Sequence, residues 1–181
     1  LQSNDGKIIG KYCKQRWCVV CNRIRTAKLI NGYVPQIQKW NDPQFVTLTA
    51  GVTVEGEHLV NRITTMNETF RKILRSNRRS HDKIIGVRKL EVTYSRRKYH
   101  AHYHVIVNSK ASADKLLREW LKRCPGASER AQDIREANEN STIELFKYFT
   151  KLFKKHDDGR IEAYPPKAMD LIFTALKNKR T

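Results

Sequence analysis

Residues 98–107 constrain the fold more than any other stretch, because histidines alternate along them with apolar side chains. On a β-strand, side chains two residues apart point to the same face. The alternation therefore places His100, His102 and His104 on one face of a predicted strand. The other face is apolar and is predicted to pack on the core, and it consists of Tyr99, Ala101, Tyr103, Val105 and Val107.

The residues before this strand form the other strand of a predicted β-hairpin, whose turn lies at residues 95–98. We expect Tyr94 to lie opposite Tyr99, a register that places Glu91 across from His102. A slip of one residue would instead turn Glu91 towards the core.

The histidine face predicts a divalent metal site. Two imidazoles and a carboxylate, here His102, His104 and Glu91, leave coordination positions open for a substrate oxygen. His100 shares this face and is expected to support a ligand rather than to be one. The alternative interpretation is a solvated sheet face that carries surface histidines.

The charge of the chain points to nucleic acid as its partner. It has 181 residues, with 36 Lys and Arg against 18 Asp and Glu, a formal charge of +18 and a pI of about 10.0. This composition is that expected of a folded, cationic protein with one main domain. No apolar run approaches the roughly 20 residues that span a membrane, so we expect no membrane association and a cytoplasmic protein. The chain begins with Leu1, so we expect it to be a fragment.

Three cysteines near the start, Cys13, Cys18 and Cys21, form a C-x4-C-x2-C array that predicts a structural zinc site. The remaining cysteine, Cys124, is the candidate fourth ligand. An iron–sulfur cluster and ordinary buried thiols remain as alternatives. Basic residues around the array suggest contacts with nucleic acid, namely Lys14, Arg16, Arg23 and Arg25.

The rest of the chain predicts the order strand, helix, strand, strand, helix, strand. Residues 44–50 alternate as a strand. The apolar side of an amphipathic helix over about residues 57–75 is predicted from residues that recur at helical spacing, namely Leu59, Ile63, Met66, Phe70 and Leu74. A second helix follows a cap at Ser112 or Asp114, and residues 131–136 form a weak strand. This order predicts an α+β, ferredoxin-like βαββαβ antiparallel sheet with helices on one face. Arg78 and Arg79, in the loop after the first helix, are candidate phosphate contacts or a solvated turn.

Residues 141–155 predict a strong helix, on which Glu144, Tyr148 and Lys151 project from neighbouring points of one face. Its core side would consist of Phe146, Phe149, Leu152 and Phe153. Glu144 also fits a capping box with Ser141, which would make it a structural residue.

These motifs together resemble the HUH endonucleases, and in particular the rolling-circle replication initiator (Rep) proteins of small bacterial plasmids. His102-Tyr103-His104 resembles the histidine-hydrophobic-histidine motif, and Thr47-Leu48-Thr49 the first motif. Ala101 departs from the proline that is usual there. The segment around Tyr148 resembles the third motif, with its nucleophilic tyrosine and a lysine three residues later. The resemblance covers roughly residues 11–155.

The resemblance implies a metal-dependent, site-specific DNA nicking and closing enzyme. Tyr148 would be the nucleophile and Lys151 would support it, whereas Glu144 would activate water or direct a later cleavage. Mg²⁺ or Mn²⁺ would bind His102, His104 and Glu91. Single-stranded or hairpin origin DNA would be the substrate, with a host helicase and polymerase as partners in bacteria. The alternatives are a single-tyrosine HUH transposase and a non-enzymatic, zinc-containing DNA- or RNA-binding module.

Three segments are expected from these motifs. They are a Cys-rich zinc-binding element at residues 1–40, an HUH endonuclease domain at 41–160 and a helical extension at 161–181.

Overall fold

The computed structural model describes residues 12–15, 18–78, 83–146, 153–155 and 158–177, and the structural statements below concern these residues. The elements in chain order are α1 (Val19–Ile37), β1 (Gln44–Thr49), α2 (Gly56–Asn77), β2 (Gly86–Ser95), β3 (Lys98–Val107), α3 (Lys110–Arg123), η1 (Glu129–Ala131), β4 (Asp133–Glu136), α4 (Glu139–Phe146), β5 (Phe153–Lys155), β6 (Ile161–Ala163) and α5 (Pro166–Leu176). None of the described helices is long and apolar enough to cross a membrane.

The main sheet has the strand order β2-β3-β1-β4, and every neighbouring pair is antiparallel. α2 connects β1 to β2, and α3 connects β3 towards β4. This is the ferredoxin-like βαββαβ arrangement, so the predicted fold class is confirmed. The predicted hairpin register is also confirmed, because Tyr94 lies opposite Tyr99 and Glu91 opposite His102.

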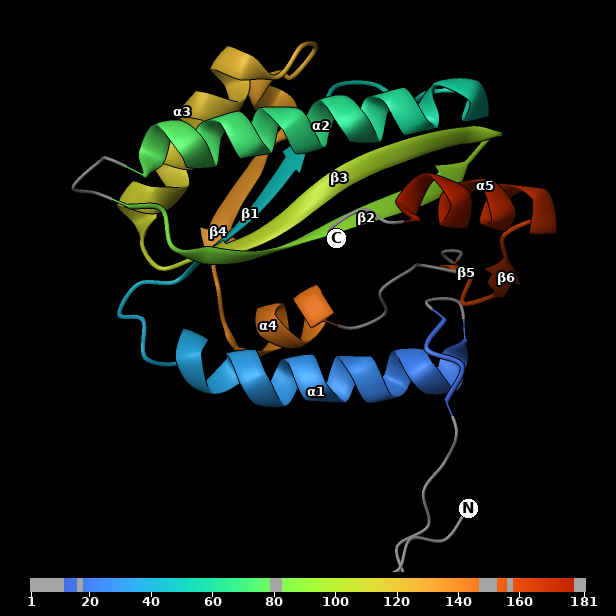
Figure 1. Cartoon of the computed structure of the whole chain (residues 1–181), viewed down its shortest axis with the longest axis horizontal. Helices are drawn as coiled ribbons and strands as arrows, with labels where there is room; N and C mark the ends of the chain where they lie inside the picture. Colours follow the sequence, from blue (N-terminus) through green and yellow to red (C-terminus); the bar gives the residue numbers. More distant parts are fainter. Residues whose placement is uncertain (1–11, 16–17, 79–82, 147–152, 156–157, 178–181) are drawn as a thin grey trace, which may run out of the picture.

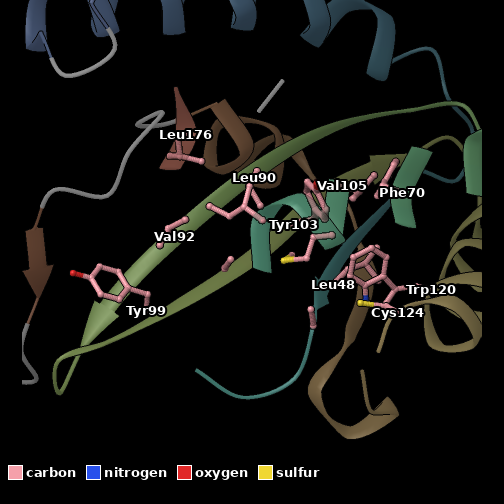
Figure 2. Close-up of a cluster of buried hydrophobic side chains, with 14 of the residues drawn as sticks. Leu48, Phe70, Leu90, Val92, Tyr99, Tyr103, Val105, Trp120, Cys124 and Leu176 are labelled. Atoms are coloured by element: carbon pink, nitrogen blue, oxygen red, sulfur yellow. The ribbon is translucent and has the colours of Figure 1, made fainter. Parts of the chain in front are cut away.

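The main core lies between the sheet and the layer that contains α2 and α3 (Figure 1). The predicted apolar face of β3 is buried there, and Figure 2 shows Tyr103 near Trp120 and Leu48, with Tyr99 farther along the hairpin. The Tyr103 hydroxyl donates a hydrogen bond to Asn67 Oδ1 on α2 at 2.7 Å. One side of α5 also joins this core through side chains that include Ala168, Ile172 and Leu176.

The opposite face of the sheet is partly covered by α1 and α4, which lie on its other side in Figure 1. Phe45 of β1 and Ile106 of β3 form a second buried cluster there with Ile37, Leu145 and Phe146. α1 was not predicted from the sequence, which suggested only a compact cysteine-rich element. α1 and α4 exclude water from the apolar half of this sheet face, and the other half carries the histidines.

Three local predictions differ from the structure. The described part of α4 spans Glu139–Phe146, and Phe153 belongs to the short strand β5 with its side chain 53% exposed, so one continuous helix over residues 141–155 is wrong. The N-cap of α3 is Ser109, whose hydroxyl accepts a hydrogen bond from the Ser112 amide at 3.2 Å. In α2, Ile73 is buried, whereas Leu74, predicted on the core side, is 40% exposed.

The chain leaves β1 through a tight turn that is held by α3 and β4. The Trp120 indole donates to the Thr49 carbonyl at 2.9 Å, and the Thr49 amide donates to the Gln132 side chain at 2.7 Å. Gly51 follows with a φ of +86°, and a Cβ there would lie 2.5 Å from the Gly126 carbonyl oxygen. This turn therefore requires glycine both for its backbone angle and for the close approach.

We predict that Gly51→Ala destabilises the protein by about 2–4 kcal/mol, because a Cβ disfavours the left-handed backbone and collides with Gly126. Gly32→Ala, within α1 and with no atom within 4 Å of the added Cβ, is the matched control. It should be neutral or stabilising by up to about 1 kcal/mol. Urea unfolding midpoints of the two variants test this, and equal midpoints would contradict it.

Candidate metal centre

The β2–β3 hairpin brings two histidines and one carboxylate together on the face that α1 and α4 partly cover. His102 Nε2 lies 4.0 Å from Glu91 Oε1, and His104 Nε2 lies 3.8 Å from Glu91 Oε2. One potential ligand atom from each of the three residues lies within 4.8 Å of the others. The grouping predicted from the strand period is thus present in the structure.

The spacing of these atoms fits a bound cation better than direct hydrogen bonds. Separations of 3.8 and 4.0 Å are too long for N–H···O hydrogen bonds, whose usual range is about 2.7–3.2 Å. They leave room for an ion with bonds of about 2.0–2.2 Å to nitrogen and oxygen ligands. His102 is only 8% exposed, and such a buried, mixed imidazole and carboxylate set suits a divalent transition metal or Mg²⁺.

Burial keeps the histidines in the form that binds metal. Desolvation, together with the neighbouring His104, lowers the pKa of His102 to about 4. Desolvation, with a contribution from Arg62, also lowers the pKa of His100. The His102 imidazole is therefore neutral near pH 7, as a metal ligand must be.

Neighbouring side chains orient the two imidazoles. Thr47 Oγ1 of β1 lies 3.3 Å from His104 Nδ1, which directs the other ring nitrogen towards Glu91. The His100 ring stacks on the His102 ring with centroids 5.3 Å apart. This position agrees with the expectation that His100 supports a ligand. His102 Nδ1 is buried and has no hydrogen-bond partner among the described residues.

Lys89 is a component of this site that was not predicted from the sequence. It lies two residues before Glu91 and opposite His104, on the same face of the sheet. Its side chain is buried, with the residue only 4% exposed, and its Nζ lies 3.5 Å from Glu91 Oε2. The strand period that grouped the histidines would have identified Lys89 if it had been applied to β2.

A second group of possible ligands lies at the start of α1. The thiols of Cys13, Cys18 and Cys21 lie within 4.8 Å of one another, and Cys13 Sγ is 3.5 Å from Cys21 Sγ. The Lys14 amide donates to Cys21 Sγ at 3.2 Å. A backbone hydrogen bond from Cys21 lowers the pKa of Cys18, which favours the thiolate that a metal requires.

The structure does not place Cys124 with these three cysteines. Cys124 follows α3 and is 4% exposed within the main core, where Figure 2 shows it beside Trp120. Desolvation raises the pKa of its thiol to about 11. The prediction of Cys124 as fourth zinc ligand is therefore wrong in this arrangement, because the apolar core on the α2 and α3 side surrounds it.

Glu144 contacts an arginine and does not form the capping box that was the structural alternative to its catalytic role. Arg135 Nη2 lies 3.0 Å from Glu144 Oε2, Arg135 Nη1 donates to Ser141 Oγ at 2.9 Å, and the guanidinium lies 4.3 Å from the Phe45 ring centroid. The start of α4 is capped by Asn138, whose Oδ1 accepts from the Ser141 amide at 2.9 Å. Arg135 was also not identified from the sequence, because it lies on a different element from Glu144.

The other predicted residues are distributed as follows. Arg23 is exposed on α1, Arg25 donates to the Lys14 carbonyl at 3.1 Å, and Arg78 is exposed after α2. Tyr148, Lys151, Arg16 and Arg79 lie outside the described residues, as do Phe149 and Leu152.

We predict that Lys89→Met tightens Mn²⁺ binding, because the ammonium beside Glu91 repels an incoming dication and competes for its carboxylate. Even with the screening of bulk water, a unit charge about 5 Å from a dication costs about 1.7 kcal/mol, so removing it should lower the Kd at least about tenfold. Electron paramagnetic resonance of free Mn²⁺ during a titration measures the Kd. Lys110→Met, at an exposed lysine that begins α3, should leave it unchanged, and His104→Ala should abolish binding. Weaker binding by Lys89→Met would contradict the prediction.

We also predict that the cysteines differ sharply in reactivity. With its pKa raised to about 11, only ~0.1% of Cys124 is thiolate at pH 8. Iodoacetamide at pH 8, after treatment with a chelator, should modify Cys13 and Cys18 long before Cys124. Peptide mass spectrometry measures each site, and urea-unfolded protein, with all four cysteines modified, is the control. Equal rates for Cys18 and Cys124 in the folded protein would contradict the prediction.

Comparisons with known proteins agree with this geometry. A family model described as "Replication protein" matches residues 8–181. The chain is 33% identical over 162 residues to "Protein rep" of Staphylococcus aureus, an alignment that covers 77% of this chain and 69% of that protein. No solved structure matches. The family match includes the hairpin with its metal-ligand group and the cysteine group. The chain therefore belongs to the Replication protein family and is a replication initiator of the plasmid rolling-circle type.

Proposed function

We propose that this protein starts replication by nicking one strand of its plasmid origin through a 5′-phosphotyrosine intermediate. The observation that carries the proposal is the position of α4 relative to the metal centre. Phe146, at the end of α4, belongs to the same buried cluster as Phe45, whose ring centroid lies 5.2 Å from that of His104. Tyr148 follows Phe146 by two residues in the sequence.

The reaction would begin at the Tyr148 hydroxyl. Its oxygen forms a bond to the scissile phosphorus while the bond from phosphorus to the 3′ oxygen breaks. The proton lost by the tyrosine is balanced by the one gained by the 3′ oxygen. A tyrosine of pKa about 10 is only ~0.1% ionised at pH 7, so the phosphate needs assistance. A divalent cation held by His102, His104 and Glu91 would polarise that phosphate and stabilise the developing charge.

The products suit the start of replication. The free 3′-hydroxyl is a primer for a host polymerase, and a host helicase would separate the strands as synthesis proceeds. The phosphotyrosine bond retains the energy of the broken phosphodiester, so attack by a later 3′-hydroxyl could close the strand. Lys151 would neutralise negative charge on the phosphate during each transfer.

We propose that Glu144 acts in a later step, as a base that activates water or a second hydroxyl. Arg135 and Asn138 support this, because Asn138 caps α4 and Arg135 holds the Glu144 carboxylate at 3.0 Å. The residue is therefore not needed as the helix cap, which was its alternative role. Its carboxylate is 58% exposed, so solvent and substrate can reach it.

We further propose that Cys13, Cys18 and Cys21 bind structural Zn²⁺. The convergence of three thiols and the Lys14 amide on Cys21 supports a thiolate site. No histidine, cysteine or acidic side chain among the described residues completes this group as a fourth ligand.

A covalent-adduct assay tests the nicking proposal. Labelled single strands from the candidate origin are incubated with the protein and Mn²⁺ and then run on a denaturing gel. We predict an adduct that requires metal and disappears completely in Tyr148→Phe, because that variant lacks only the attacking oxygen. Tyr33→Phe, at a 41% exposed tyrosine of α1, is the matched control and should form the adduct normally.

Two outcomes would contradict the proposal. An adduct that persists in Tyr148→Phe would assign the nucleophile elsewhere. Tight binding without an adduct on any origin-derived strand would favour a non-enzymatic nucleic-acid-binding module. In the same assay, Glu144→Gln should still form the adduct but release it more slowly.

A further inference from the structure

The turn of the β2–β3 hairpin has an unusual backbone for its sequence. Ser95 pairs with Lys98, so the loop has two residues, Arg96 and Arg97, with φ angles of +51° and +61°. Positive φ at both central residues is the requirement of a type I′ turn, which strongly favours Asn-Gly. Arginine is disfavoured there because its Cβ crowds the left-handed backbone. The chain therefore tolerates local strain in order to carry two arginines at this point.

The base of this turn is rigidly held. The Tyr94 ring lies 5.0 Å from the Tyr99 ring and 5.6 Å from the Tyr164 ring, measured between centroids. The Tyr94 amide donates to the Tyr164 hydroxyl at 3.2 Å, and Tyr99 pairs with Val54 through two backbone hydrogen bonds of 2.8 Å. These contacts fix the residues on either side of the turn. The backbone of Arg96 and Arg97 is therefore held in its strained conformation.

The positive charges at the turn have no partner within the described part of the chain. Arg96, Arg97 and Lys98 are all exposed, and none of them forms an ion pair with a described carboxylate. No intramolecular charge pair therefore offsets the backbone strain. Strained residues that persist at an exposed site are commonly retained for function.

We propose that Arg96, Arg97 and Lys98, the hairpin tip, bind DNA phosphates that flank the scissile phosphate. This inference rests on the proposed function, because it takes the metal centre as the nicking site. The Ser95–Lys98 pair lies four residues beyond the Glu91–His102 pair along the hairpin, or about 13 Å. The hairpin tip therefore lies within a few nucleotides of the scissile phosphate, because successive base pairs of a duplex rise about 3.4 Å along the helix axis. The hairpin tip thus fixes the register of the DNA on the metal centre.

The test is a variant that removes the charges and improves the turn at the same time, Arg96→Asn with Arg97→Gly. Because Asn-Gly favours the type I′ backbone, we expect the Tm to rise by about 2–6 °C. We expect the affinity for a fluorescein-labelled DNA stem–loop with a single-stranded arm to fall at least about tenfold at low salt. The slope of log K against log salt should decrease by about 1.4–1.8, the value for two lost phosphate contacts.

Two further variants separate this site from general charge. Arg96→Lys with Arg97→Lys keeps the charges and should bind almost as the unaltered protein does. Arg118→Gln with Lys122→Gln removes two exposed charges from α3 and should change the affinity by less than about threefold. The proposal is overturned if the Asn-Gly variant binds the stem–loop normally, or if the α3 variant weakens binding equally.

The binding is measured by fluorescence anisotropy without added Mg²⁺ or Mn²⁺, so no strand cleavage takes place and zinc on the cysteine group is not removed. Failure of the nicking proposal would appear as a missing covalent adduct, whereas failure of the hairpin-tip proposal would appear as unchanged DNA affinity and salt slope. The rise in Tm shows that the Asn-Gly variant is folded, which excludes loss of structure as the cause of weaker binding.

Discussion

The pairing register of β2 with β3 is the constraint on which the candidate metal centre depends. Side chains alternate between the two faces of a strand, so one register serves both the core and the site. Leu90 and Val92 face the core only when Glu91 faces His102. A slip by one residue would bury the Glu91 carboxylate among apolar side chains and expose Leu90. The hydrophobic free energy of the core therefore holds the ligands together before any metal binds.

The two faces of the sheet have different physical roles. The α2 and α3 face contains most of the apolar burial, and the Tyr103 hydroxyl buried there donates a hydrogen bond to Asn67. The α1 and α4 face is apolar at Phe45 and polar at the histidines. Partial burial on that face keeps His102 neutral and strengthens the interaction of Lys89 with Glu91. The candidate cation site is therefore buried together with a competing positive charge, that of Lys89.

Strain and charge occur together at the exposed end of the hairpin. Arg96 and Arg97 occupy a turn that Asn-Gly would adopt more easily, above a base of stacked tyrosines. Gly51 shows the opposite solution, because a glycine stands where the backbone is left-handed and closely packed against Gly126. The comparison indicates that this chain uses glycine where packing alone decides. At the hairpin turn it has arginines in place of the favoured Asn-Gly, because their side chains are available for the proposed contact with DNA phosphates.

The hairpin, its register and the grouping of His102, His104 and Glu91 were determined by the sequence itself. They depend on a period of two and a short turn, which are local properties. The same holds for the three clustered cysteines, which lie within nine residues of the chain. The position of α2 and the terminal helix followed from helical spacing in the same way.

The tertiary structure alone decided which distant residues meet. Spacing along the chain does not reveal that Cys124 lies in the core on the α2 and α3 side, or that Arg135 reaches Glu144 across two elements. The apolar residues of 141–155 predicted one helix, but residues 153–155 pair with β6, and Phe146 packs with Phe45 and Ile106 in the second buried cluster. α1 has only a weak apolar stripe, so its helix was not recognised. Local periodicity acts over a few residues, whereas these outcomes depend on burial and contacts that exist only once the layers have assembled.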